Sequence, residues 1–357
     1  GYALAVSLIV IVVVSLLATA GYSMSDFELN ASRDFSAETE AFYLADRGLN
    51  KYMATLASDL EKDTTFQFAN GTAAVAPEQV ALGTGIQDNE ELHRVTSTGT
   101  YVTPDGETVQ RTVSTLLLAT PMLPVYPNGA FVVGGKLHQN GTSATFDGNN
   151  EYTSSNTDPV CEAAGVQKGG DVSGLVADSL TASTKASGGG SGQCQDLKSG
   201  MVSPDPPGVD CQNDPVDEFM SAEQWEYMMN EMPADHEVSG SDPLPSTDGW
   251  EVIRADGDYD PSDSGNTGQG ILVVTGDFES DGNLTWDGLL LVGGRFISNG
   301  KEDISGGVVT GLNSLLGANV PPTSIGNGNK SFSYDACSVF KASRSKYRVS
   351  KVPSTWY

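Results

Sequence analysis

Four aspartates lie close together in the segment DGDYDPSD, namely Asp256, Asp258, Asp260 and Asp263. Alternating carboxylates with Gly and Ser between them can surround a hard cation with oxygen ligands, and calcium is the usual choice outside the cell. The spacing lacks the glutamate that closes an EF-hand loop at its twelfth position. A solvated acidic loop is the favoured interpretation, because the chain carries 46 acidic and only 19 basic side chains.

The four cysteines include no Cys-x-x-Cys pair; they are Cys161, Cys194, Cys211 and Cys337. In an exported chain an even number of cysteines predicts two disulfides, with three possible pairings. We favour Cys194–Cys211 and Cys161–Cys337, since the first pair encloses a Pro- and Gly-rich loop with little core of its own. Pairing of Cys161 with Cys194 stays open as an alternative.

Groups for catalysis are scarce. The three histidines, His93, His138 and His236, leave little material for imidazole chemistry or for Cys/His zinc sites. No Ser/His/Asp set stands at a fixed spacing, and no Gly-rich segment opens a helix as a nucleotide loop would. A formal net charge of -27 repels phosphate backbones and argues against nucleic-acid binding. We therefore expect no enzyme, and no cofactor other than the calcium considered above.

The chain begins with an uncharged apolar run. No side chain from Gly1 to Ser25 is charged, and the stretch ALAVSLIVIVVVSLLATA has only Ser and Thr as polar residues. Such a run is long enough to cross a bilayer as a helix. It fits a secretory signal, a membrane anchor or the N-terminal helix of a filament subunit. Because the chain starts on the run without Met or a basic leader, we expect a leader to have been removed.

Helix is predicted to continue beyond this run. Between Ser23 and Asp63 there is no Pro and only one Gly, Gly48. Apolar residues recur every seven positions and predict a stripe that packs on a folded domain: Phe35, Phe42, Leu49 and Leu56. We therefore expect one helix over residues 1–63, with residues 1–25 suited to a membrane or a filament core.

The segment Ala41–Asn50, AFYLADRGLN, is close to the phrase AFYLAEAGLN in the N-terminal helix of PilX-like pilus assembly proteins. Roughly the first sixty residues resemble type IV pilin-like proteins in this way. The resemblance implies a leader removed by a prepilin peptidase, with Gly1 or Tyr2 as the mature N-terminus. It also implies that apolar helix residues hold neighbouring subunits together, and the candidates are Leu4, Leu8, Val10, Ile11, Val14 and Leu17.

This sequence departs from the pilin pattern at one position. Most pilins have Glu at the fifth mature residue, where it pairs with the N-terminal amine of a neighbour. Here Ala5 or Val6 stands there, and the apolar run contains no carboxylate. Pseudopilins that cap the tip of secretion pili also lack this Glu. The departure favours a minor subunit over a repeating major one.

A β-rich region follows the helix. The alternating segments 91–103 and 107–119 flank a turn at Pro104-Asp105-Gly106, which predicts a hairpin. We expect residues 64–125 to form a hairpin region that packs on the helix.

An internal repeat predicts the architecture of residues 126–357. The segment Val132–Gly141 matches Leu291–Gly300, and Val273–Gly282 fits the same pattern 18 positions before the second copy. Short strands with Asn-Gly corners at this period predict stacked rungs of a β-solenoid. A β-sandwich with similar hairpin turns is the alternative. A Gly-, Ser-, Asp- and Pro-rich insertion spans about 149–270 and contains one predicted helix over 217–231.

The C-terminus is basic and is predicted to form a strand. Its candidate residues for an intersubunit contact are Arg344, Lys346, Arg348 and Lys351. The alternation in SKYRVSKV is typical of a strand. This strand either completes its own domain or docks on an acidic face of a neighbouring subunit.

The sequence thus predicts an α+β chain with a long pilin helix and a β-solenoid-like C-terminal domain. The predicted function is a structural subunit of an extracellular type IV pilus-like filament at the cell surface. Its partners would be copies of itself and other pilins, and its precursor would lie in the inner membrane. Two alternatives remain: a minor tip-located pilin that primes assembly or adhesion, and a membrane-anchored β-solenoid carbohydrate-binding protein.

Overall fold

The computed structural model describes residues 2–55, 63–82, 91–122, 126–140, 144–180, 186–187, 193–196, 202–204, 209–211, 215–247, 249–261, 266–326 and 328–352. The chain forms two compact units. One contains residues 1–119 and 349–357, and the other contains residues 120–348. The chain therefore leaves the first unit once and returns to it with its last strand.

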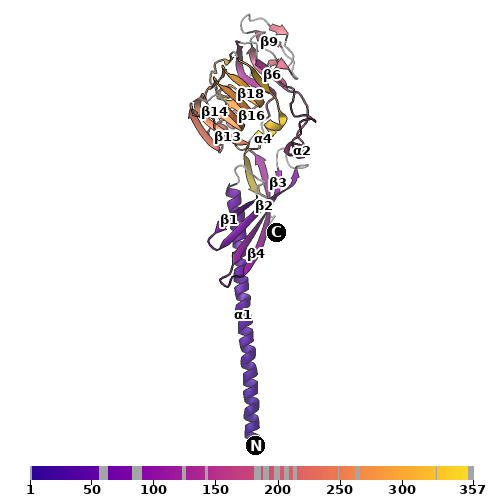
Figure 1. Ribbon diagram of the computed structural model, residues 1–357, viewed down its shortest axis with the longest axis vertical. Coiled ribbons are helices and arrows are strands. Elements are labelled where there is room, and N and C mark those ends of the chain that lie inside the picture. The colour runs from indigo at the N-terminus through magenta and orange to yellow at the C-terminus, as the bar shows by residue number, and fades with distance from the viewer. Residues whose placement is uncertain are drawn as a thin grey trace. The chain divides into compact units, whose positions relative to one another are not determined.

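The first unit is a long helix with a five-stranded sheet on its C-terminal half (Figure 1). The helix α1 spans Tyr2–Thr55. The sheet has the order β1-β2-β3-β4-β21, with β1 Thr64–Phe68, β2 Gly71–Leu82, β3 Glu91–Val102, β4 Thr108–Pro121 and β21 Tyr347–Lys351. Strands β3 and β4 form the antiparallel hairpin that the alternation predicted, with Glu91 opposite Ala119 and Val102 opposite Thr108.

Alanines together with larger apolar residues form the face of α1 that packs on the sheet, and of the described members of the predicted stripe only Leu49 lies in it. The buried positions of this face are Ala37, Ala41, Leu44, Ala45, Leu49 and Tyr52. Phe35 is 73% exposed and Phe42 is 45% exposed, so the prediction that they pack on the domain is wrong. Leu56, the last member of the predicted stripe, lies outside the described residues. Alanines stand where the helix backbone lies directly against β3, because a Cβ on Gly99 of β3 would overlap the carbonyl oxygen of Ala41.

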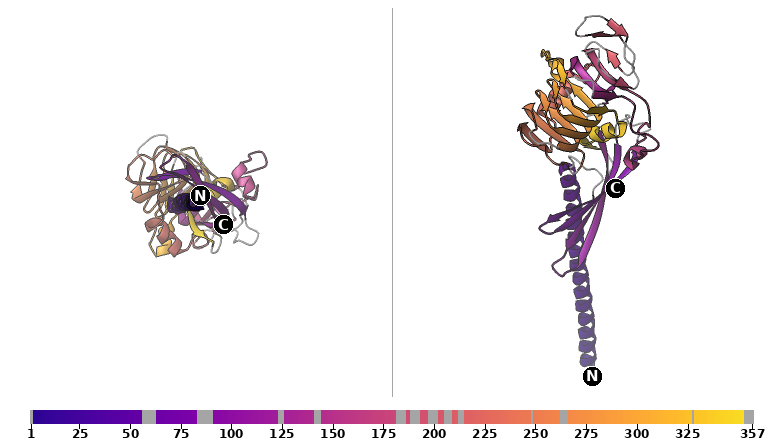
Figure 2. Two further views of the ribbon diagram at one scale, coloured as in Figure 1. Left: turned by 90° about the horizontal axis from the view of Figure 1, so that it is seen from below. Right: turned by 45° about the horizontal axis from the view of Figure 1, so that its top comes forward.

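The second unit is built from parallel strands (Figures 1 and 2). Its main strands are β5 Gly129–Gln139, β6 Ala144–Asp147, β7 Ser173–Leu180, β13 Glu251–Tyr259, β14 Asn266–Val274, β15 Phe278–Ser280, β16 Asn283–Val292, β17 Phe296–Ser298, β18 Lys301–Thr310, β19 Thr323–Ile325 and β20 Lys330–Ser333. Shorter strands are β8 Ala186–Ser187, β9 Gln193–Asp196, β10 Val202–Pro204, β11 Val209–Cys211 and β12 His236–Gly240. The helices are α2 Pro159–Ala163, α3 Ala222–Asn230, α4 Ala336–Ser343 and the 3-10 turn η1 Leu312–Leu316.

The 18-residue repeat appears as parallel register between successive strands. Gly270 of β14 pairs with Gly288 of β16, which pairs with Gly306 of β18. At Gly288, φ is +122°, a conformation that L side chains rarely adopt, and a Cβ would overlap the carbonyl oxygen of Gly270. The repeated glycines therefore mark the corner at which each strand turns against the one before it.

These strands close into a ring, so the prediction of a solenoid is wrong. The pairings run β5-β19-β17-β15-β13-β14-β16-β18 and return to β5, which gives a closed parallel barrel of eight strands. Two strands close the ring, because each of them joins the run β14-β16-β18 to the run β15-β17-β19. Strand β13 pairs with both β14 and β15, and β5 pairs with both β18 and β19. Strands β20, β6 and β8 continue from β18 on one side, and β7, β9 and β10 continue from β5.

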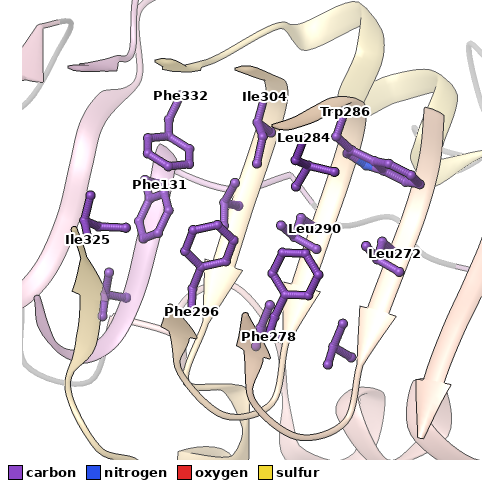
Figure 3. Close-up of a cluster of buried hydrophobic side chains, with 14 of the residues drawn as sticks. Phe131, Leu272, Phe278, Leu284, Trp286, Leu290, Phe296, Ile304, Ile325 and Phe332 are labelled. Atoms are coloured by element: carbon purple, nitrogen blue, oxygen red, sulfur yellow. The ribbon is translucent and has the colours of Figure 1, made fainter. Parts of the chain in front are cut away.

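Aromatic rings fill the interior of the barrel (Figure 3). Phe131 packs edge-on against Phe332 with ring centroids 4.7 Å apart, and Phe278 lies 5.3 Å from Phe296. Residues next to these in sequence point the opposite way into a second cluster under α3, α4 and η1, which includes Trp225. One wall of the barrel is therefore buried on both faces, as is usual for parallel sheets. The helix predicted over 217–231 corresponds to α3.

Candidate functional site

The most prominent functional surface is the N-terminal half of α1. Its apolar side chains are exposed to an unusual degree: Leu8 57%, Val10 53%, Ile11 64%, Val14 58% and Leu17 67%. The side chain of Leu4 lies outside those that the structure describes. The described part of α1 from Ser7 to Ala54 includes an 18-residue stretch of mean hydropathy 2.1, of which none is buried. By length and composition this helix could cross a membrane.

Polar groups in this stretch are satisfied by the helix itself. The hydroxyl of Thr19 donates to the carbonyl of Ser15 at 2.8 Å, and the hydroxyl of Ser23 donates to that of Ala20 at 3.0 Å. Because these hydroxyls need no water, the surface is suited to lipid or to the apolar side chains of other helices. Exposed to water, it would leave a large apolar area without a partner. The geometry is compatible with a membrane anchor, with a signal sequence and with helix packing.

The chain matches no protein-family model, and neither the curated proteins nor the solved structures contain a match.

The structure confirms one predicted disulfide. Cys161 of α2 is bonded to Cys337 of α4 across 176 residues of sequence. The bond is buried in a small cluster with Tyr152 and Phe340. The side chains of Cys194 and Cys211 lie outside the described ones, so their pairing stays a prediction.

The described members of the acidic segment form hydrogen bonds within the second unit. Asp258 Oδ1 accepts from the amide of Asp277 at 2.8 Å, and Asp256 Oδ1 accepts from Thr275 Oγ1 at 3.3 Å. The amide of Asp260 donates to Gly240 O at 2.8 Å. These bonds tie successive barrel turns together, whereas Asp263 lies outside the described residues.

Only one grouping of metal-ligand types occurs among the residues that the structure describes: Asp158 with Cys161 and Cys337. Since the two sulfurs are bonded to each other, they are not available as thiolate ligands. The prediction of calcium in DGDYDPSD therefore finds no support from the three aspartates that can be placed.

The basic C-terminal residues are used within the chain. Lys346 is buried, and its Nζ lies 2.5 Å from Asp235 Oδ1. The guanidinium of Arg344 stacks on the Phe340 ring at 4.1 Å, and burial lowers its pKa. Lys351 Nζ donates to Asn50 Oδ1 at 3.2 Å. The side chain of Arg348 is not among those described.

The tail forms a strand of its own chain, and docking on a neighbouring subunit stays a prediction. Strand β21 lies beside β4 as the last strand of the first unit's sheet, and the amide of Val352 donates to Leu116 O at 3.0 Å. The strand is thus paired along one edge with β4, and Lys346, which directly precedes it, is buried against Asp235. The alternative prediction, that the tail completes a domain of its own chain, is the one that the structure confirms.

Sequence reasoning missed a buried ion pair inside the second unit. Lys330 and Glu302 are both fully buried, with Nζ 3.1 Å from Oε2. The signal was present in the repeat: charged residues stand at these positions, whereas the equivalent position in β16 is Leu284. The pattern of glycines and aliphatic residues that defines the repeat does not include these two positions.

Proposed function

We propose that this chain is a structural subunit of an extracellular type IV pilus-like filament. The exposed apolar half of α1 packs against the same segment of other copies or of other pilins. The β-rich remainder of the chain faces solvent, where its acidic surface keeps the fibre soluble. Before assembly the same apolar segment lies in the inner membrane.

One observation carries this proposal: the apolar segment is continuous with a helix that is anchored on the protein's own sheet. A removable signal needs no such continuity, whereas α1 runs without a break from Tyr2 to Thr55 and packs its second half on β2 and β3. The resemblance of residues 41–50 to the PilX-like phrase supports the same function. A rigid connection between core helix and outer domain suits a subunit that must bear load.

A minor, tip-located role is the second candidate, and one observation favours it. The first charged residue is Asp26, so no carboxylate is available in the apolar segment to pair with a neighbouring N-terminal amine. Copies of this chain would have to align by packing alone. A subunit at the tip, which primes assembly or adheres, has less need of this pairing.

Substitution of Val10 tests the proposal. Val10→Asp places a carboxylate in the packed helices, at a cost of several kcal/mol, and should abolish fibres in sheared supernatants. Val10→Trp stays apolar and tolerable to lipid but is too large for close helix packing, so it should also reduce fibres while leaving the protein in the membrane fraction. Val10→Ile is the matched control and should assemble normally.

The amount of chain in fibres separates the two candidates. A structural subunit should be the main protein of purified fibres, whereas a tip subunit should be present at one end and in small amount. Immunogold labelling along the fibre or only at its end gives the same distinction. Normal fibre yield from both Val10→Asp and Val10→Trp would overturn the proposal for either role.

A further inference from the structure

A lysine and a glutamate face each other in the interior of the second unit. Glu302 of β18 and Lys330 of β20 are direct partners in register on adjacent parallel strands. Both side chains are 0% exposed, and Lys330 Nζ lies 3.1 Å from Glu302 Oε2. Lys330 Nζ also donates to the carbonyl of Gly300 at 2.5 Å, which fixes the amine beside the carboxyl group.

The inward-facing neighbours of this pair on the sheet are apolar. Along the same row of the sheet, Leu284 precedes Glu302 and Ala144 follows Lys330. The next inward-facing residues on the two strands are Ile304 and Phe332, both buried. Neither oxygen of Glu302 accepts a hydrogen bond from the residues that the structure describes.

An ion pair in such a place is poorly compensated. Removing two charges from water costs several kcal/mol for each ion, and only excellent hydrogen bonding offsets this. A carboxylate without hydrogen-bond donors is therefore a poor end state for this site. Transfer of one proton from the ammonium to the carboxylate would remove both charges and leave a neutral amine beside a neutral acid.

We propose that Lys330 and Glu302 are joined by an intramolecular isopeptide bond. The lone pair of the neutral Nζ attacks the carboxyl carbon of Glu302, so that a C–N bond forms. The C–OH bond of the acid then breaks, and the hydroxyl leaves as water with a proton from the nitrogen. Amine and acid thus give an amide and one water, and the step needs no oxidant, reductant or other reactant.

The fold supplies what this condensation requires. Pairing of β18 with β20 holds the two groups together and replaces a bimolecular encounter with a unimolecular step. Exclusion of bulk water disfavours the reverse hydrolysis. An open depression lined by Thr145, Lys301, Asp303 and Ser331 borders the pair and offers the released water a way out.

The bond would link the barrel to the strand that leads into α4. Because α4 is bonded to α2 through Cys337, the segment from β18 to α4 would then carry a covalent link near each end. Pulling on the chain would not separate β20 from β18 unless a covalent bond broke. This inference does not depend on the filament function.

Tryptic mapping of the folded full-length chain tests the bond. Trypsin cuts after Lys301, Lys330 and Lys341, so an unlinked chain yields the separate peptides 302–330 and 331–341. An amidated Lys330 resists trypsin. The linked chain should therefore yield one peptide, 302–341, lighter by one water than its sequence mass, with fragment ions that join Glu302 to Lys330.

Two variants serve as controls, and the disulfide, read from a portion of the digest that is not reduced before analysis, reports folding. Glu302→Met should restore cleavage at Lys330, whereas Asp303→Asn alters an exposed neighbour and should keep the linked peptide. If folded wild-type protein, with Cys161 bonded to Cys337, releases peptide 302–330 at its full sequence mass as the main product, the inference is wrong. A peptide 302–341 at full mass would be a missed cleavage and would count against it equally.

Discussion

Gly99 of β3 lies against the backbone of α1 at Ala41, so closely that a Cβ on Gly99 would overlap the Ala41 carbonyl oxygen and crowd the Ala45 amide. Ser97, two residues earlier on the same face of β3, donates its hydroxyl to the carbonyl of Ala45 at 2.7 Å. Helix and strand are thus in backbone contact, and the register between them is set by a glycine and a hydrogen bond. This contact attaches α1 to the sheet, and the apolar N-terminal segment is part of the same helix.

Replacing Gly99 should loosen the helix from its sheet. Gly99→Val forces α1 and β3 apart, and we expect the free energy of unfolding to fall by about 1–3 kcal/mol or more. Thermal unfolding of the detergent-solubilised chain, followed by circular dichroism, measures the loss. Gly249→Ala is the control, because a Cβ there meets nothing within 4 Å. Equal melting temperatures for wild type and Gly99→Val would contradict the close contact.

The disulfide between α2 and α4 should be a main source of stability in the second unit. Replacing Cys161 and Cys337 together by Ser should lower the free energy of unfolding by about 2–4 kcal/mol, because the bond closes a long loop in the unfolded chain. Urea titration of the variant measures this. Reduction of the wild type should reproduce the loss, and a reduced protein as stable as the oxidised one would show that the bond is not a structural constraint.

Asp158 should make stability depend on acid pH. Burial raises the pKa of Asp158, but the ion pair with Lys341 and hydrogen bonds from the amides of Cys161 and Val160 together hold it below the usual value. A lowered folded-state pKa contributes stability above the unfolded pKa of about 3.9, and this contribution is lost as pH falls further.

Asp158→Ala also removes the cap of α2 and should cost about 0.5–2 kcal/mol at pH 7. The difference from wild type should shrink below about pH 4. Asp158→Asn is the matched control, since Asn caps a helix but forms no ion pair. A pH-independent difference for both variants would exclude the charged interaction.

The carboxyl group of Asp287 should make the stability fall, and not rise, as pH increases. Burial raises the pKa of Asp287, and the carboxylates of Asp335, Asp303 and Glu151 raise it further. A raised folded-state pKa means that stability falls as pH rises through the unfolded and then the folded pKa. Asp287→Asn should therefore stabilise the chain at pH 7, by no more than about 1 kcal/mol because the side chain is solvent-accessible.

Salt provides the check on this prediction. Repulsion among exposed carboxylates is screened over about 8 Å at physiological ionic strength, so the gain from Asp287→Asn should shrink as salt is added. It should also shrink as pH falls through the unfolded pKa of about 3.9, because the wild-type carboxyl then becomes protonated in both states. Asp171→Asn, a change at an exposed loop carboxylate, is the control. A gain that is unaffected by salt would show that repulsion by Asp335, Asp303 and Glu151 does not contribute to it.

Local patterns predicted a good part of this structure. The uncharged run at the N-terminus, the alternation on either side of Pro104-Asp105-Gly106 and the 18-residue spacing each reflect interactions between residues near in sequence. The helix α1, the β3–β4 hairpin and the parallel register of Gly270 with Gly288 follow from them. The pairing of Cys161 with Cys337 was favoured only by elimination, and the structure confirms it.

The sequence by itself therefore determined the kinds of element and their local period, because hydrophobic spacing and turn residues act over a few positions. The tertiary structure decided which of those elements pack against one another. Closure of the barrel depends on β5 reaching β18 and β19 from a distant part of the chain. The burial of Lys346, and the choice of alanines over Phe35 and Phe42 as the packed face of α1, depend likewise on partners that no local pattern reveals. Such contacts follow from shape and backbone proximity, which exist only once the chain is folded.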